Sequence, residues 1–375
     1  MATTSVEPAA PPRAGGRAPS AGRLRARLED ALLPPIVALL IALVIGDLLI
    51  LSFGQSPGAV FAQLLSGTWG NAYGFGQVLF KATTLTFTGL AVAFGLRAGL
   101  FNIGAEGQIA AGGFAAAAVA LALGNAPAVV GIPLAMAGAA LAGGVVGAVP
   151  GALKARFGAH EVIVTIMLNF IVLALLNWIV SAHMAVPETL HTAPIRTGTV
   201  PRLSELVDAL HGSAANLTIL VAIGAALWYS WYLFRTRGGY ELRATGLQPG
   251  AAEYGGVSVG RVWLKAMILS GAIAGLGGIN AVLGYKGYYE EGMTVGAGFI
   301  GIAVALVGRN SAAGVVIAAL LFATLSQGGL AINAIVPKQM VEVLEAVVII
   351  AVAAAVPAVR LALRTARRAE GGEPA

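Results

Sequence analysis

The sequence predicts an all-α, polytopic integral membrane protein with about ten transmembrane segments, some of them interrupted or re-entrant, and with both termini in the cytoplasm. Of the 375 residues, 58% are hydrophobic and only 11% are charged, whereas about a quarter of the residues in soluble domains are charged. The apolar residues fall in runs that approach the roughly 20 residues needed to cross a bilayer. Glycine is abundant, with 51 residues, and small residues let transmembrane helices approach closely.

Five spans are predicted in the first half of the chain. Residues 1–30 are rich in Pro, Ala, Gly and Arg, and we expect a disordered cytoplasmic tail before a membrane domain over 31–363. No A-x-A-type site closely follows the first span, which we therefore expect to stay uncleaved. A short helix at Ala59–Leu65 is expected at the outer surface, and Lys154-Ala-Arg156 is expected to form a basic loop. The predicted spans are Ala31–Phe53, Val78–Leu96, a run ending near Leu123, Pro127–Val149 and Val162–Val180.

The second half has shorter and more interrupted apolar runs. A polar extracytoplasmic loop is predicted over 183–215, a cytoplasmic loop over 235–265 and a cytoplasmic tail over 364–375. The nine residues Phe299–Val307 are too few to span as a straight helix. Together with the turn at 308–311, they predict either an interrupted helix or a tight hairpin that enters the membrane part-way. The apolar runs are Leu217–Phe234, Met267–Leu283, Phe299–Val307, Ala312–Leu325 and Val341–Val356.

The placement of basic residues predicts the orientation. With the N-terminus inside, most of the 23 Lys and Arg residues lie in segments on the cytoplasmic side, including the loop 235–265, as the positive-inside rule requires. The net charge of +6 is then a consequence of topology. The lipid bilayer is the expected surrounding, and no nucleic-acid partner is expected.

Three groups of glycines have the four-residue spacing of close helix contacts. They are Gly95-x-x-x-Gly99, Gly143-x-x-x-Gly147-x-x-x-Gly151 and Gly271-x-x-x-Gly275. A general bias toward Ala and Gly would produce the same spacing, so each match alone is a weak signal.

The sequence excludes several kinds of chemistry. There is no cysteine, which excludes disulfides, thiolate nucleophiles and Cys-ligated metals. No G-x-S-x-G, H-E-x-x-H or Gly-Lys pattern occurs, so neither a hydrolase site nor a P-loop is expected. His183, His191 and His211 lack metal-ligand spacing, and we expect solvated loop side chains. No cofactor, metal or catalytic residue is predicted.

Two polar groups interrupt the apolar spans. Asn102, Glu106 and Gln108 follow the second span with almost no hydrophilic loop, and a carboxylate at membrane depth suggests a translocation pathway. A tight cytoplasmic turn with a solvated glutamate explains them equally well. Glu161, Thr165 and Asn169 lie four residues apart on one helical face. This stripe either lines a pathway or bonds neighbouring helices.

Within the loop 235–265, residues 248–256 predict a very short helix. Pro249 suits the first helical position, and Glu253 is expected to complement the positive helix N-terminus. Gly255 and Gly256 are expected to end the helix in the left-handed conformation. Such a short helix is not stable alone, so it would be held by the loop, by the membrane domain or by a partner.

Four motifs resemble permease subunits of bacterial ABC importers. They are GLFNIGAEGQ at 99–108, EVIVTIMLN at 161–169, RATGLQPGAAEYG at 243–255 and GIAVALVGRN at 301–310. The resemblance covers about residues 59–330. It is strongest to nucleoside importers supplied by lipoproteins of the basic-membrane-protein type, within the superfamily of ribose and branched-chain amino-acid permeases.

The resemblance implies a multi-pass permease of the bacterial plasma (inner) membrane, with a homologous second permease as its partner. It further implies a cytoplasmic ABC ATPase and an extracytoplasmic substrate-binding lipoprotein. A coupling helix at 246–256 would dock in the ATPase, and ATP-driven closure would switch the permease between outward and inward openings. The expected coupling residues are Gly246, Pro249, Ala251, Ala252, Glu253, Tyr254 and Gly255.

Nucleoside translocation by alternating access is therefore the leading hypothesis, with ATP hydrolysis assigned to the partner subunit. Two alternatives stay open. One is the same machine for a simple sugar or a branched-chain amino acid. The other is an ion-coupled secondary transporter that uses Glu106 or Glu161 as its coupling carboxylate.

Overall fold

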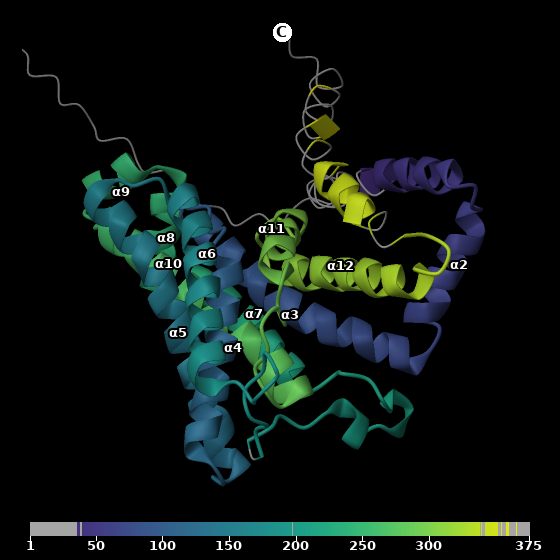
Figure 1. Cartoon of the computed structure of the whole chain (residues 1–375). Coiled ribbons are helices and arrows are strands. Elements are labelled where there is room, and N and C mark those ends of the chain that lie inside the picture. The colour runs from purple at the N-terminus through teal and green to yellow at the C-terminus, as the bar shows by residue number, and fades with distance from the viewer. Residues whose placement is uncertain are drawn as a thin grey trace, which may run out of the picture.

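The computed structural model describes residues 36–37, 40–196, 198–337, 339, 342–351, 354, 358–359 and 365. The predicted tail 1–30, and all of 364–375 except Thr365, lie outside these residues. The described part of the chain is helical apart from its loops, and it contains isolated β-bridges but no strand. The predicted all-α class is confirmed (Figure 1).

Seven described helices are long and apolar enough to cross a membrane, or eight spans if the bent pair Leu40–Ser52 and α2 counts as one. The seven are α3 (Ala72–Arg97), α4 (Ala105–Leu123), α5 (Ala128–Phe157), α6 (Glu161–Ile179), α7 (Thr218–Arg235), α10 (Val259–Ala281) and α12 (Ala312–Ile332). The shorter helices are α2 (Pro57–Thr68), α8 (Arg237–Leu247), α9 (Pro249–Tyr254) and α11 (Ala297–Val307). Parts of the predicted first and last spans lie outside the described residues, so the count of about ten stays a prediction.

The predicted spans from Val78 to Leu283 and the span at Ala312–Leu325 are confirmed as helices, most of which extend beyond the apolar run. Phe299–Val307 lies in the shorter helix α11, and its crossing stays a prediction. Lys154 and Arg156 lie in the last turn of α5, so the predicted basic loop is wrong. The negative C-terminal end of a helix favours basic side chains there, and Gly158, with φ of 66°, ends the helix. The predicted helix Ala59–Leu65 is confirmed as part of α2, which is bent by 109° from Leu40–Ser52.

α10 packs against α5 along the two predicted glycine rows. A Cβ added at Gly143 would overlap the carbonyl oxygen of Gly271, and one at Gly147 would overlap the carbonyl oxygen of Met267. Because lipid provides no hydrophobic drive between helices, such close backbone approach is a main source of their attraction. These glycine spacings are confirmed as a helix contact.

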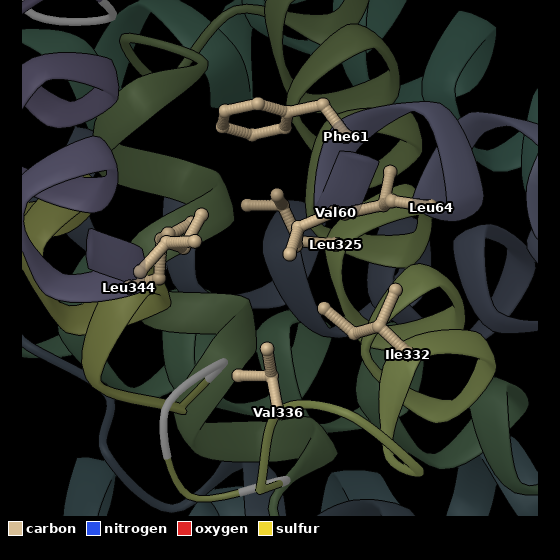
Figure 2. Close-up of a pocket in the computed structure, with 8 residues that line it drawn as sticks. Val60, Phe61, Leu64, Leu325, Ile332, Val336 and Leu344 are labelled. Atoms are coloured by element: carbon tan, nitrogen blue, oxygen red, sulfur yellow. The ribbon is translucent and has the colours of Figure 1, made fainter. Parts of the chain in front are cut away.

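A small apolar cavity of about 20 Å³ marks the seam between α2 and α12. Figure 2 shows side chains from α2, from α12 and from the residues after α12 converging on it. The lining residues are Ile50, Val60, Phe61, Leu64, Leu325, Ile332, Val336 and Leu344. Across the same seam, Trp69 Nε1 donates a hydrogen bond to Thr324 Oγ1 at 3.1 Å. Apolar packing therefore attaches the N-terminal helices to α12.

α11 packs alongside only about half of the length of α3. Gly301, near the middle of α11, lies against Thr88 in the second half of α3. The turn after α11 reaches the end of α3, where Arg97 bonds to Asn310. Irregular chain at 287–296 precedes α11, and α12 returns along α3 in the opposite direction. The segment therefore corresponds to the interrupted helix and not to the part-way hairpin.

We expect Gly143→Val to destabilise the permease by about 1–3 kcal/mol or more, because overpacking at a backbone contact forces the helices apart. Thermal unfolding in detergent, followed by the loss of monodisperse protein, measures the effect. Gly224→Val in α7 is the matched control, since a Cβ at Gly224 would meet no atom within 4 Å. Equal unfolding temperatures for the two variants would contradict the role of the glycine row.

Candidate functional site

The short helix predicted over residues 248–256 is confirmed as α9. Pro249 occupies the first helical position, where a missing amide hydrogen costs nothing. Gly256 has φ of 81°, as expected for a left-handed end, but Gly255 has φ of −77° and is not left-handed. Glu253 lies beyond the first turn of the six-residue helix, so its expected interaction with the positive N-terminus is wrong.

The rest of the loop 235–265 is more helical than predicted. α8 fills much of it, and α10 already begins at Val259. The hydroxyl of Thr236 caps α8 by accepting a hydrogen bond from the amide of Gly239 at 3.0 Å. Leu242 is the large apolar side chain that α8 buries. Because α8 buries so few apolar side chains, its sequence lacks the periodic apolar face by which a helix is predicted. The polar composition of residues 237–247 therefore did not predict α8.

α9 projects from the end of the molecule opposite the segment 183–215 (Figure 1). The side chain of Tyr254 is 98% exposed, and that of Leu247 just before α9 is 85% exposed. Ala252 is buried and holds α9 against the rest of the loop. Two large side chains with this much exposure in one short stretch make α9 and its approach a candidate surface for binding another protein.

α8 rests directly on the C-terminal end of α3. A Cβ added at Gly246 would overlap the carbonyl oxygen of Arg97. Gly99 has φ of 75° and lies against the backbone of Gly246. Gly99 has therefore already left α3, and the predicted helix contact through Gly95-x-x-x-Gly99 is wrong. With backbone against backbone, a displacement of α8 must also displace the end of α3.

Three hydrogen bonds meet at the carbonyl oxygen of Asn310, in the turn between α11 and α12. Arg97 donates two of them, from Nε at 3.1 Å and Nη2 at 2.8 Å, and the Tyr229 hydroxyl donates the third at 2.9 Å. Arg309 and Asn310 have φ of 54° and 53°, a left-handed conformation that is uncommon for residues other than glycine. The bonds hold this turn to α3 and α7.

The carboxylate of Glu106 joins the beginnings of two helices. Glu106 lies in the first turn of α4, is 3% exposed, and accepts hydrogen bonds from the amides of Gly296 and Gly298, both at 2.7 Å. These amides lie at the start of α11, whose unpaired N–H groups and positive dipole end favour an anion. Glu106 is thus held by the protein and is not a solvated turn residue.

Asn102 and Gln108 form a buried amide pair at the same level. Asn102 Nδ2 donates to Gln108 Oε1 at 2.9 Å and to Ser270 Oγ at 2.7 Å. Ser270 Oγ in turn donates to the carbonyl oxygen of Ala91 at 2.6 Å. Ala91 lies about 9 Å from Arg97 along α3, at about 1.5 Å per residue. The chain therefore turns back along α3, and α4 begins inside the span.

The stripe on α6 bonds this re-entering chain to its neighbours. Asn169 Oδ1 accepts a hydrogen bond from the Gly107 amide at 2.9 Å, and Asn169 Nδ2 donates to the Ile103 carbonyl at 3.0 Å. The hydroxyl of Thr165 donates to the carbonyl of Glu161 in its own helix at 2.8 Å. The contacts of Asn169 favour the helix-bonding interpretation of the stripe.

Glu161 lies where α5 and α6 meet. Its carboxylate is 2.9 Å from the ammonium group of Lys154, and the two side chains are 12% and 23% exposed. The Lys154 ammonium also lies 5.5 Å from the centre of the Trp263 ring. Glu161 is therefore paired where α5 ends and α6 begins, beside the start of α10.

Sequence analysis missed the partners of the predicted residues. Ser270, Gly296 and Gly298 lie more than 150 residues from Asn102 and Glu106, and no local pattern links them. The six predicted pathway residues are absent from the lining of the cavity between α3, α10, α11 and α12. Their observed contacts hold helices together, and the pathway role stays a prediction.

We expect Glu106→Gln to lower stability by about 1–3 kcal/mol, because an amide can accept only one of the two hydrogen bonds and leaves a buried N–H unpaired. Thermal unfolding of the purified protein measures this. Glu161→Gln is the control, because its partly exposed ion pair contributes about 1 kcal/mol or less. A Glu106→Gln protein as stable as the control would contradict the capping role.

Comparison with known proteins shows the family. A family model described as "Branched-chain amino acid transport system / permease component" matches residues 74–353. The chain is 41% identical over 330 residues to the guanosine ABC transporter permease protein NupP of Bacillus subtilis (strain 168), covering 86% of this chain and 93% of that protein. It is 33% identical over 328 residues to the nucleoside ABC transporter permease protein NupB of Lactococcus lactis subsp. cremoris (strain MG1363), covering 86% and 90%.

A third relative is the glucose ABC transporter permease protein TsgB13 of Haloferax volcanii, 32% identical over 327 residues, covering 84% of this chain and 85% of that protein. No solved structure matches the chain. The family match covers well over half of the chain, and it includes the α8–α9 loop, the Glu106 contact and the α11–α12 turn. The chain therefore belongs to the family of ABC-transporter permease components, of the branched-chain amino acid transport type.

Proposed function

We propose that this chain is the membrane-spanning subunit of an importer for nucleosides, and that a separate cytoplasmic ATPase drives it through α8 and α9. The two most similar relatives named above are described as guanosine and nucleoside permeases, and each is aligned over about nine-tenths of its length. The structural observation that carries the coupling role is the exposed α9, which rests on a helix that is itself packed against α3. Family membership disfavours the ion-coupled alternative.

The contact with the ATPase would centre on Tyr254 and Leu247. Both side chains are exposed in the permease, and large apolar or aromatic anchors commonly provide most of the binding energy of an interface. Pro249, Ala251, Ala252 and Gly255 would shape the helix, and Glu253 would lie at its edge. The short α9 needs such a groove, because six residues are too few for a stable free helix.

A displacement of α9 would be transmitted through α8 and α3 to the middle of the membrane-spanning part. Gly246 lies against Arg97, and Arg97 holds the α11–α12 turn through the Asn310 carbonyl. α11 ends in this turn and begins at Glu106. This chain of contacts supports a two-state movement in which ATP binding shifts the inner end of α3 together with α11.

A homologous second permease and an extracytoplasmic substrate-binding lipoprotein complete the proposed transporter. Support for a second permease is the exposure of α5, α6 and α7, since most of each candidate span lies on the surface of the described chain. Lipid would cover part of this surface, and the partner permease the rest. The lipoprotein would meet the permease at the end that bears the segment 183–215 (Figure 1). The bacterial plasma membrane is the proposed location, and ATP hydrolysis is assigned to the ATPase.

Deletion of the permease should abolish ATP-dependent uptake of radiolabelled guanosine by whole cells. Unlabelled inosine should compete with the label, whereas glucose and leucine should not. Re-expression of the permease from a plasmid should restore uptake. The glucose relative in Haloferax volcanii gives the second candidate substrate class, and loss of glucose uptake instead of guanosine uptake would establish it.

The double variant Tyr254→Asp, Leu247→Asp should weaken binding of the ATPase by about 2 kcal/mol or more, as expected for central anchors of an interface. The fold should be unaffected, because both side chains are exposed. Copurification of the ATPase with tagged permease measures the effect. Tyr73→Asp is the control, since Tyr73 is 51% exposed at the opposite end of α3. Undiminished copurification with the double variant would refute the coupling surface.

A further inference from the structure

An apolar groove of about 360 Å³ lies between α7 and α10. Apart from the indole N–H of Trp228, its lining side chains carry no hydrogen-bonding group. The lining residues are Val221, Gly224, Ala225, Trp228, Leu269, Ala272, Ile273 and Leu276. Small residues leave the space open, since a Cβ added at Gly224 would meet no atom within 4 Å. Both helices are candidate membrane spans, so the groove lies within the membrane-spanning part.

α3 holds the wall of the groove that α7 forms. The ring of Trp228 stacks on the ring of Phe94 in α3, with ring centres 6.1 Å apart, and on the ring of Tyr232, 5.1 Å away. Because these contacts fix α7 on α3, α7 cannot close the gap to α10 without losing them. An empty groove forfeits dispersion contacts along both of its walls. We therefore expect an occupant that is itself apolar.

The dimensions of the groove match one hydrocarbon chain. A buried cavity of about 150 Å³ is known to hold benzene, so 360 Å³ corresponds to roughly fourteen carbon atoms. Along α10, the distance from Lys265 to Leu276 is roughly 16 Å of helix. The hydrocarbon core of a bilayer is about 30 Å thick. The groove and Lys265 together therefore extend over about one leaflet.

One end of the groove carries two basic side chains. Lys265 lies four residues before Leu269 in α10, on the same helical face. Arg235 lies two turns after Trp228 in α7, also on the face of the groove. Both basic side chains are exposed, and neither forms an ion pair with another residue that the structure describes. The groove is therefore apolar along its length and positively charged at the end where α7 leads into α8.

The carboxylates of this region do not cancel the charge. The segment 235–265 contains five basic and two acidic residues. Of the two acidic residues, Glu241 pairs with Arg237 at 2.9 Å, and Glu253 is exposed on α9. Arg235 and Lys265 are left to attract an anion at the membrane surface.

We propose that the groove between α7 and α10 binds one anionic phospholipid, with an acyl chain along the groove and the phosphate at Lys265 and Arg235. Basic sites between transmembrane helices are typical of anionic headgroup recognition, and the groove supplies apolar surface for the chain. In the proposed orientation the lipid comes from the cytoplasmic leaflet. It would fill the gap beside α8 and connect α7 to α10. This inference is independent of which solute the transporter carries.

A second copy of the chain fits this groove less well. Two identical subunits that share a patch are related by a two-fold axis, and in a membrane this axis lies along the membrane normal. The same end of each copy then faces the same side of the membrane. Pairing through the groove would bring the basic ends of both copies together, and like charges placed side by side disfavour association. A phospholipid supplies the opposite charge.

Native mass spectrometry of the full-length chain in detergent tests the proposal. Phosphatidylglycerol is the anionic probe, and phosphatidylcholine with the same acyl chains is the zwitterionic probe. One phosphatidylglycerol should bind at least about ten times more tightly, since each nearby Lys or Arg contributes about five-fold. Inorganic phosphate should not displace it, because phosphate has no chain to bury. Equal affinity of the two lipids would overturn the proposal.

Lys265→Gln should weaken the binding of phosphatidylglycerol about five-fold, because one of the two charges at the headgroup is lost. Arg156→Gln is the matched control. Arg156 is exposed at the end of α5, and α5 packs against the other face of α10, which bears Gly271. An unchanged affinity in Lys265→Gln, or an equal loss in both variants, would overturn the headgroup assignment.

Gly224→Phe should weaken the same binding about ten-fold or more, because the phenyl ring takes the place of several methylene groups of the chain. Leu227→Phe is the control, since Leu227 is 68% exposed on α7 and does not line the groove. Without lipid, both variants should unfold at the temperature of the parent chain, because the space beside Gly224 is open. Equal affinity in the two variants would contradict the placement of the acyl chain.

A photoactivatable lipid locates the site in the assembled transporter without any substitution. Membranes that contain the complex take up phosphatidylglycerol with a diazirine in its acyl chain, and the adducts are mapped by peptide mass spectrometry. We expect adducts on Leu269 and Ile273 that excess unlabelled phosphatidylglycerol removes and phosphatidylcholine does not. Adducts on Leu227 without any on the lining residues would show that another chain covers the groove, and would overturn the proposal.

Discussion

The bond between Glu106 and the start of α11 is the contact on which most of the arrangement depends. Two helices begin inside the membrane-spanning part, and no water is available there for their unpaired amides. The carboxylate of Glu106 satisfies two of these amides, at Gly296 and Gly298. It thereby fixes where α11 begins relative to α4. The position of the α11–α12 turn follows from this placement.

The remaining packing divides the protein into a close-packed part and a part suited to movement. α5 and α10 approach until their backbones touch, because glycines face each other along the contact. Such a contact leaves little freedom for sliding. By contrast, Tyr254 of α9 is exposed, and α8 meets the C-terminal end of α3 where Gly246 lies against Arg97 and Gly99. A force applied at α9 would therefore be passed to α3 and to the turn at Asn310.

Sequence analysis succeeded where the signal was local. The apolar runs from Val78 to Leu325, the glycine rows and the helix that begins at Pro249 were all predicted and are present. It failed where tertiary contacts overrode the local pattern. α8 has a polar composition and was missed, because burial of a few residues such as Leu242 holds it. Lys154 was placed in a loop, but α5 continues through it because Glu161 and the helix dipole stabilise its charge.

The sequence by itself determined the membrane class, the positions of most spans, the short helix α9 and the resemblance to ABC permeases. These properties follow from hydropathy, turn chemistry and short motifs, which act over a few residues. Only the tertiary structure decided that Glu106 caps α11 and that Lys81 donates a hydrogen bond to Ser326. The partners in these contacts are separated by 190 and 245 residues. Such pairs are set by which helices pack together, and a single sequence carries no local signal for that.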